Sequence, residues 1–287
     1  MKILLLGGYG MAGHMVASYL RTRPGDELVV AVRPRTAPNR TLKALDGLQV
    51  RELDVRSFEA VEDLVRECGP DVIVNAVGIL NHHAEDRPLD AYRVNGWLPH
   101  WLRHLGDRCG ARLIHISSDC VFSGERGGPH RETDEPDGKT VYARSKALGE
   151  VFDGKHVTIR TSIIGPDDNP SGIGLMKWFL SREGEVKGYR NVLWNGVTTL
   201  ELAKAIDWLL RRPEVGGLVH LAAPETVSKH ELLLMMQERF DKRNVTIVPV
   251  EEPVIDRTLA ATRSDFDYRP PRYAEMLEEL RRWTAAR

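Results

Sequence analysis

Residues 1–13 read Met1-Lys2-Ile3-Leu4-Leu5-Leu6-Gly7-Gly8-Tyr9-Gly10-Met11-Ala12-Gly13. The apolar run predicts a strand, and glycines follow it at positions 7, 10 and 13, where a helical pattern begins. In such a loop the first glycine permits a tight turn, the second lets a phosphate approach the backbone, and the third lets the helix pack against the strand. The helix N-terminus then attracts a pyrophosphate. We therefore expect a dinucleotide-binding loop formed by Gly7, Gly10, Met11, Ala12 and Gly13.

Short apolar runs alternate with longer segments of helical period through about the first 160 residues. Runs of this length, bounded by turn residues, are typical of strands buried on both faces of a parallel sheet. The runs are Ile3–Leu6, Leu28–Val32, Val72–Val74, Leu113–Ile116 and Val157–Ile159. Strand–helix alternation implies right-handed crossovers. We expect an α/β fold, a doubly wound parallel Rossmann sheet with a small C-terminal α/β substrate lobe.

The alternation becomes irregular where glycine and proline cluster, in the stretch Gly165–Gly172. Helical patterns and short strands continue beyond it. We expect residues 1–162 and about 193–222 to form the cofactor-binding Rossmann domain. Residues about 163–192 and 223–287 would then form the substrate-binding lobe.

Composition narrows the class of protein. The 40 Lys and Arg residues against 41 Asp and Glu give a formal net charge of −1, without the basic excess of a nucleic-acid-binding protein. No apolar run approaches the roughly 18 residues that a membrane-spanning helix needs. Cys68, Cys109 and Cys120 lack CxxC spacing, and the adjacent His82-His83 has no third ligand pattern, so we expect no metal site. A cytoplasmic protein with neither a nucleic-acid nor a membrane partner fits best.

The end of the second predicted strand indicates which cofactor the loop binds. A ribose 2′-hydroxyl is usually bound there by an acidic residue, but this chain has Arg33 and Arg35. Arginine pairs with a 2′-phosphate through charge-assisted hydrogen bonds. The pattern therefore favours NADPH over NADH. Asp54 and Val55, after the third strand, are candidates for contact with the adenine.

A tyrosine, a lysine and a serine form the candidate catalytic group. Tyr142 and Lys146 are four residues apart, which places them on one face of a helix. An ammonium beside a phenol, together with an oxidised nicotinamide, is expected to lower the phenol pKa from about 10. Ser118 follows the run Leu113–Ile116, at the carboxyl edge of the sheet where ligands of such folds bind. We expect its hydroxyl to bond a carbonyl group that is being reduced.

These motifs together resemble an extended short-chain dehydrogenase/reductase. The stretch His115-Ile116-Ser117-Ser118-Asp119-Cys120-Val121-Phe122-Ser123-Gly124, followed by Glu132-Thr133-Asp134 and Val141-Tyr142, is similar to the dTDP-4-dehydrorhamnose reductase family. The resemblance covers roughly residues 1–165 well and the rest loosely. It implies NADPH-dependent reduction of the 4-keto group of a nucleotide-linked deoxysugar.

The resemblance also implies roles for single residues. Tyr142 would give its proton to the nascent alkoxide, Lys146 would bind the nicotinamide ribose, and Ser118 with Asp119 would contact the substrate. The remaining positions implied near the cofactor are Asn75, Ala76, Val77, Asn95 and Thr161. Asn95 also matches an asparagine that supports the active-site strand end in that family. Two departures from the family pattern matter, because Ser118 replaces a threonine and Cys120 replaces an aromatic residue.

Alternative activities of the same fold remain open to different degrees. A 4,6-dehydratase resembling this fold carries a glutamate base where this chain has Cys120, so that base is absent. A cysteine-dependent epimerase places its cysteine one residue earlier. A 4-epimerase uses the same Ser/Tyr/Lys set, and a non-catalytic NADP-binding regulatory subunit would keep the cofactor loop alone. The presence of both Tyr142 and Lys146 favours an enzyme.

The C-terminal half offers candidate contacts for a nucleotide sugar. Gly188–Thr198 combines aromatic, amide and arginine side chains just before a clear helical pattern. Arg190 could pair with a diphosphate and Trp194 could stack on a base, although Trp194 could equally pack between the lobes. A nucleotide-diphospho-sugar is the expected partner. A homodimer is only the commonest assembly of such chains.

Overall fold

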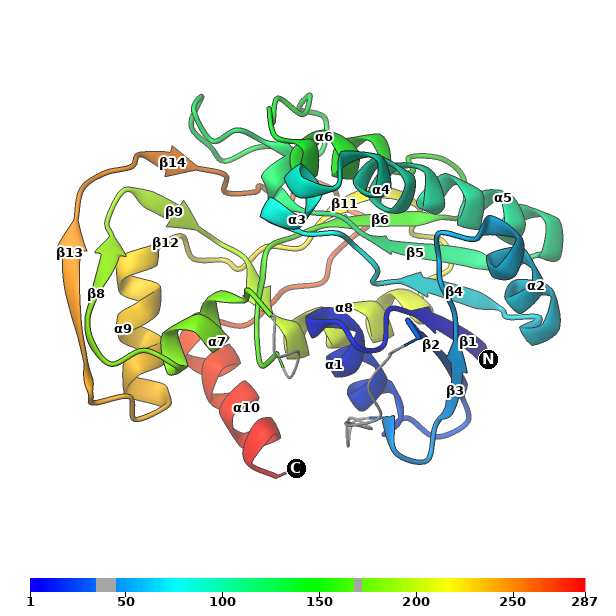
Figure 1. Cartoon of the computed structure of the whole chain (residues 1–287), viewed down its shortest axis with the longest axis horizontal. Coiled ribbons are helices and arrows are strands. Elements are labelled where there is room, and N and C mark those ends of the chain that lie inside the picture. Colours follow the sequence, from blue (N-terminus) through cyan, green and yellow to red (C-terminus); the bar gives the residue numbers. More distant parts are fainter. Residues whose placement is uncertain (35–44, 168–171, 287) are drawn as a thin grey trace.

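A computed structural model describes residues 1–34, 45–167 and 172–286 of the chain. Its centre is a seven-stranded sheet in the order β11-β6-β5-β4-β1-β2-β3 (Figure 1), and every neighbouring pair in it is parallel. The strands are β1 (Lys2–Leu6), β2 (Glu27–Val32), β3 (Gln49–Glu52), β4 (Val72–Asn75), β5 (Arg112–Ile116), β6 (Val157–Arg160) and β11 (Gly217–His220). The chain moves outward from β1 to β3, returns to β4 and continues in the other direction. The expected doubly wound α/β fold is confirmed, with its topological switch point between β1 and β4.

Helices cover both faces of the sheet (Figure 1). On one face lie α1 (Met11–Leu20) and α8 (Thr199–Leu210), and on the other lie α2 (Phe58–Cys68) and α5 (Leu98–Cys109). Alternate residues of β1 serve the two faces: Ile3 packs into the α1–α8 side and Leu4 into the α2–α5 side. This explains why the strand is apolar throughout, since successive side chains of a strand point to opposite faces.

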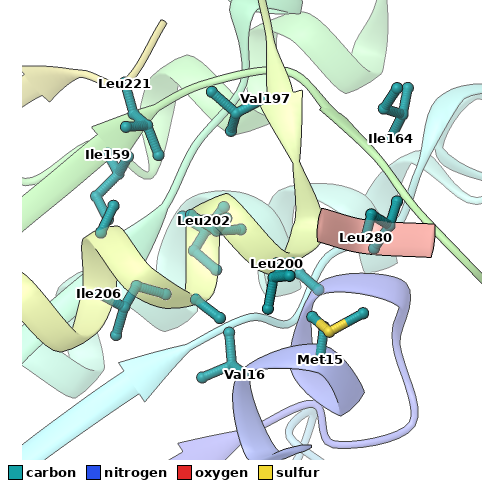
Figure 2. Packing of buried hydrophobic residues seen from close by; sticks show 14 of the residues in the cluster. Met15, Val16, Ile159, Ile164, Val197, Leu200, Leu202, Ile206, Leu221 and Leu280 are labelled. Carbon is teal, nitrogen blue, oxygen red and sulfur yellow. The ribbon is translucent and has the colours of Figure 1, made fainter. Parts of the chain in front are cut away.

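The core between the sheet and α8 continues into the C-terminal helix α10 (Tyr273–Ala285). Figure 2 shows Met15 of α1, Leu200 of α8 and Leu280 of α10 meeting in one cluster. Leu200 is 3% exposed and Leu280 is fully buried. The C-terminal helix is therefore packed into the same core as the first helix.

The C-terminal lobe lies beside the main sheet and consists of small sheets and helices (Figure 1). Its strands pair as β8 (Gly184–Tyr189) with β13 (Val245–Val250), and as β12 (Val227–Ser228) and β14 (Ile255–Asp256) on either side of β9 (Val192–Trp194). Strands β7 (Ile163–Ile164) and β10 (Val197–Thr198), which precede β8 and follow β9 in the chain, form a two-stranded parallel sheet. The helices of the lobe are α7 (Leu175–Leu180) and α9 (Lys229–Arg239). The residue ranges given above for the two parts stay a prediction.

The segment between β4 and β6 carries the shorter helices that surround the candidate site. They are α3 (Asn81–Asp86), α4 (Pro88–Ala91), the π-helix η2 (Tyr92–Trp97), the 3-10 turn η3 (Asp119–Val121) and α6 (Val141–Leu148). In the described parts of the chain, no helix combines the length and the apolar character needed to cross a membrane.

Candidate active site

The glycine loop lies between β1 and α1, as expected. Gly7 has a φ of +92°, a conformation that favours glycine, and its N–H donates to the Ala31 carbonyl at 3.0 Å. A Cβ on Gly13 would lie 2.1 Å from the Gly7 carbonyl oxygen, so only glycine permits this approach of helix to strand. The first turn of α1 has neither an acidic residue nor a side-chain cap. The loop thus suits the phosphates of a dinucleotide, because free N–H groups and the positive end of the helix dipole attract anions.

The residues expected near the adenosine end lie after β2 and β3. Arg33 follows β2 directly and is exposed, whereas Arg35 lies outside the described residues. Asp54 follows β3, and its carboxylate accepts a 2.6 Å hydrogen bond from the Arg56 guanidinium, which lowers the Asp54 pKa. Val55 is half-buried beside it. The assignment of Arg33, Asp54 and Val55 to the cofactor stays a prediction.

Asn75 ends β4 and orders the loop that follows. Its Oδ1 accepts a 3.1 Å hydrogen bond from the Val77 N–H, and its Nδ2 lies 3.1 Å from Nδ1 of His115 on β5. A Cβ on Gly7 would come within 3.0 Å of the Ala76 carbonyl, so this loop lies directly against the glycine loop. The structure therefore brings Asn75, Ala76 and Val77 to the switch point of the sheet.

Asn95, on the π-helix η2, holds helix α6 in place. Its side chain accepts from the Ile79 N–H at 2.8 Å and donates to the Ile79 carbonyl at 2.9 Å. It also donates to the Ser145 hydroxyl at 3.0 Å, and that hydroxyl donates to the Tyr142 carbonyl at 3.0 Å. Asn95 thus joins α6 to the segment after β4, which agrees with the supporting role that the family resemblance implies.

Ser118, Tyr142 and Lys146 meet at the carboxyl edge of the sheet. Thr140 caps the N-terminus of α6: its hydroxyl accepts from the Ala143 N–H at 3.0 Å and so sets the first turn, which carries Tyr142. The Lys146 ammonium donates a 2.6 Å hydrogen bond to the Ile116 carbonyl at the end of β5. Ser118 lies two residues further, and its hydroxyl is near enough to the Tyr142 phenol to act on the phenol pKa. The three polar groups predicted as catalytic therefore lie together, all of them buried.

The proton affinities of the two groups on α6 follow from burial. Burial raises the Tyr142 pKa, the Asp119 carboxylate adds to the rise, and the neighbouring Ser118 hydroxyl opposes it. In the chain without a nicotinamide the Tyr142 pKa is thus raised, and the expected lowering by Lys146 is not found. Burial lowers the Lys146 pKa to about 8, although Glu150 opposes the shift. At neutral pH the phenol is accordingly protonated, which is the state that a proton donor requires.

A buried ion pair that the sequence analysis missed lies against Ser117, the residue before Ser118. Two nitrogens of the Arg160 guanidinium donate to the Glu150 carboxylate at 2.7 Å each, and both side chains are 1% exposed or less. The Ser117 hydroxyl donates to the same carboxylate at 2.8 Å. Thr161, the next residue after β6, donates from its hydroxyl to the Leu221 carbonyl at 2.8 Å. No local sequence signal marks Glu150, because its partners come from β6 and from the residue that follows β5.

The lobe supplies two cations that were also missed. The Arg257 Nη1 lies 3.8 Å from the Cys120 Sγ, and its Nε donates to the Ser123 carbonyl at 3.1 Å. The Lys229 Nζ lies 4.6 Å from the centroid of the Trp194 ring. Burial raises the pKa of the Cys120 thiol to about 12, so this cysteine is a neutral thiol near Ser118.

The two lobe residues predicted to bind substrate lie in different surroundings. Trp194 is 3% exposed and stacks on Tyr273 with ring centroids 5.5 Å apart. This gives Trp194 a packing role between the lobes and leaves little surface for stacking on a base. Arg190 is exposed at the turn between β8 and β9, with its Nη1 3.5 Å from the Glu251 carboxylate. The structure does not bring the two side chains into one binding surface.

A parallel sheet with a glycine loop after β1 and a Ser–Tyr–Lys group at its carboxyl edge defines the class of extended short-chain dehydrogenases/reductases. More narrowly, the chain belongs to the RmlD substrate binding domain family, whose model matches residues 1–278. It is 30% identical over 265 residues to dTDP-4-dehydrorhamnose reductase of Salmonella typhimurium, covering 88% of this chain and 82% of that one.

Solved structures show the same fold at lower identity. The dTDP-4-dehydrorhamnose reductase of Bacillus anthracis in complex with NADP matches with a TM-score of 0.76 and 18% identity, over 97% of this chain and 98% of that one. UDP-glucose 4-epimerase of Thermotoga maritima with UDP-glucose matches with a TM-score of 0.80 and 17% identity, over 100% of this chain and 99% of that one. Reductases and epimerases thus share this fold. The similarity of sequence, and not the fold, identifies the family to which the chain belongs.

Proposed function

We propose that this chain is an NADPH-dependent reductase of the 4-keto group of a nucleotide-diphospho-6-deoxy-hexulose, acting in the synthesis of an activated deoxysugar. The observation that carries the proposal is the placement of Tyr142 and Lys146 on one helix, with the Lys146 ammonium bonded at 2.6 Å to the end of β5, two residues before Ser118. Family membership and the similarity to dTDP-4-dehydrorhamnose reductases support it.

The dinucleotide fits the residues present at the switch point. Glycine at position 13 lets α1 pack closely against the loop, where a Cβ would clash with the Gly7 carbonyl, and the uncapped first turn of α1 offers N–H groups to phosphates. Arg33 would pair with the 2′-phosphate, and Lys146 would bind the nicotinamide ribose. When bound, NADPH supplies the hydride for the reduction.

The polar groups of the chain act on the oxygen of the keto group. The Ser118 hydroxyl donates a hydrogen bond to this oxygen and orients it toward Tyr142. As charge develops on the oxygen, the Tyr142 phenol gives up its proton to it, leaving a phenolate that the nearby Lys146 charge stabilises. Asn95 and Ser145 hold α6 so that the phenol stays directed at the serine.

A spectroscopic assay tests the proposal directly. We expect the purified chain to oxidise NADPH, followed by its near-ultraviolet absorbance, when it is given a dTDP-linked 4-keto-6-deoxy sugar. NADPH binding without oxidation across a panel of dTDP-, UDP- and GDP-linked 4-keto sugars would contradict the proposal and favour a regulatory subunit. Interconversion of 4-hydroxy sugars without net consumption of cofactor would favour an epimerase.

The cellular setting is part of the same proposal. A cytoplasmic location suits a reaction that consumes NADPH and a nucleotide-linked sugar. A homodimer is the commonest assembly for a chain of this kind. Sedimentation of the purified chain at several concentrations would test the dimer.

A further inference from the structure

Two cations of the lobe face the segment that carries the catalytic serine. Lys229 is the first residue of α9, and Arg257 follows β14 directly. The hydrogen bond from Arg257 to the Ser123 carbonyl, at 3.1 Å, fixes this guanidinium beside Cys120. In the described parts of the chain, neither cation forms an ion pair with a carboxylate.

Lys229 is held in place without a polar partner of its own. Ser228 and Glu231 form a capping box, with the Glu231 carboxylate accepting from the Ser228 N–H at 2.7 Å, and this starts α9 at Lys229. The ammonium lies over the Trp194 ring, and no hydrogen bond from it is present within residues 1–34, 45–167 and 172–286. The positive end of the α9 dipole adds to its charge. A half-buried ammonium at such a place is a binding group for an anion.

The cations and the proton donor share the same surroundings. Ser228 and Asp256, the residues before the two cations, both pair with Leu193 of β9, so the lobe sheet holds the cations near each other. The Asp119 charge acts on the Tyr142 phenol and on the Lys229 ammonium. Burial lowers the Lys229 pKa to about 8, and the Arg257 charge contributes to the lowering. Asp119 is the carboxylate that faces the pair, and one negative charge does not neutralise two positive ones.

We propose that Lys229 and Arg257 bind the phosphate attached to the anomeric carbon of the sugar. This inference rests on the proposed function, in which Ser118 and Tyr142 hold the oxygen on C4. Because C4 and C1 are opposite corners of a six-membered ring, a sugar held in this way directs its anomeric phosphate away from the catalytic pair. A guanidinium and an ammonium are the groups that bind phosphate most strongly.

The other substituents of the sugar fit this place less well. The methyl group of a 6-deoxy sugar would leave two half-buried cations without a partner, which is energetically unfavourable. A carboxylate on the sugar would satisfy them, but the proposed substrate has none. The β-phosphate of the nucleoside diphosphate is the anion that the proposed substrate offers on this side of the ring.

Binding of nucleotides without a sugar tests the inference. The affinities of dTDP, UDP and GDP are measured by calorimetry, and the tightest of them is compared with its monophosphate, in the wild type and in Lys229→Met. Methionine keeps an unbranched stem over Trp194 and removes the charge. We expect Lys229→Met to weaken binding of the diphosphate about 10- to 100-fold, the range for a hydrogen bond to a charged group, and to change binding of the monophosphate by less than about twofold.

Matched variants make the result specific. Lys229→Arg should keep most of the preference for the diphosphate, and Lys187→Met, at an exposed lysine of β8, should leave both affinities unchanged. Arg257→Gln should lower the affinity for the diphosphate in the same direction as Lys229→Met. NADPH affinity, measured by fluorescence, should be equal in all variants because the cations lie on the lobe.

Three results would overturn the inference. The first is an equal loss of affinity for diphosphate and monophosphate in Lys229→Met, and the second is that the wild type binds none of the diphosphates. The third is a loss of affinity in Lys229→Met for UDP-glucuronate but not for UDP-glucose, which would identify a carboxylate site. None of these measurements depends on turnover. A chain that shows the diphosphate preference but reduces no 4-keto sugar would therefore refute the proposed reaction and keep the phosphate site.

Discussion

The ammonium of Lys146 donates a 2.6 Å hydrogen bond to the carbonyl of Ile116, the residue that ends β5. Ser117 and Ser118 follow immediately, so one contact ties the lysine of α6 to the strand end that presents the serine. The same placement buries the ammonium, which is why its pKa falls to about 8 despite the nearby Glu150. The lysine therefore changes its charge close to physiological pH.

The first prediction concerns the pH dependence of the reduction. Lys146 is charged below about pH 8 and loses its proton as the pH rises through that value. We expect kcat/KM, which reports groups of the free enzyme, to be level on the acid side and to decline above about pH 8. A pH–rate profile with NADPH and the keto sugar measures this, and a level profile far above that pH would contradict it.

Lys229 has a similar pKa, so the profile needs a control. If the decline belongs to Lys146, it persists in Lys229→Met. Burial of Lys146 also affects stability. Between about pH 8 and the unfolded pKa of about 10.4, the unfolded chain binds more protons than the folded chain. The Lys146 contribution to the free energy of unfolding therefore increases with pH in this range. If the alkaline decline of kcat/KM is absent in Lys229→Met, that decline is due to Lys229 rather than Lys146.

The second prediction concerns the proton donor. Tyr142→Phe removes only the hydroxyl that gives the proton to the substrate oxygen, so we expect kcat to fall by about two to four orders of magnitude, the range for general acid catalysis. Affinity for NADPH should change little, as measured by fluorescence titration. Tyr189→Phe makes the same change at a half-buried tyrosine of β8. This variant serves as the control and should keep full turnover. An active Tyr142→Phe variant would remove Tyr142 from the mechanism.

The third prediction concerns cofactor choice. Arg33 follows β2 and is exposed, and Arg33→Asp would replace the proposed partner of a 2′-phosphate with a residue that repels it. We expect NADPH to bind about 10- to 100-fold more weakly, the range for a lost charged hydrogen bond, while NADH binds equally or better. Arg131→Asp makes the same change of charge in the loop before α6 and should affect neither cofactor. Unchanged discrimination in Arg33→Asp would shift the role to other residues.

The fourth prediction concerns the ion pair beneath the serine segment. Glu150→Gln leaves the Arg160 guanidinium buried without its counter-charge, so we expect the free energy of unfolding to fall by about 3–5 kcal/mol. Urea unfolding followed by circular dichroism measures the loss. Glu62→Gln removes the half-buried partner of the exposed Arg108, at 2.9 Å, and should cost about 0–1 kcal/mol. Similar losses in the two variants would show that the buried pair has no special weight.

Much of the fold could be predicted from short-range pattern. The glycine spacing after Ile3–Leu6 and the apolar runs determined the parallel sheet, because residues buried on both faces must be apolar at every position. The meeting of Ser118 with Tyr142 followed from a general rule, since the carboxyl ends of parallel strands share one edge. The packing of Asn95 against Ser145 agreed with the family resemblance.

The rest depends on contacts between distant parts of the chain. Arg257 reaches Cys120 across 137 residues, and Lys229 owes its place to a capping box and a tryptophan ring from another strand. No local spacing encodes either contact. Burial raises the Tyr142 pKa in the chain alone, whereas the predicted lowering also counted the charge of an oxidised nicotinamide. A sequence shows which charges are nearby in the chain but not how deeply a phenol is buried.

Strand β11 pairs with β6 along one edge of the main sheet, although 56 residues separate the end of one from the start of the other, including α7, β8 and β9. A fragment that stops at the end of β6 would therefore expose that strand's hydrogen-bonding edge and the apolar surface that α8 normally covers. Unpaired edges of this kind promote aggregation. Limited proteolysis or split expression at the junction after β6 should consequently yield an insoluble N-terminal piece, and recombining the halves in one cell should restore solubility only when both are synthesised together.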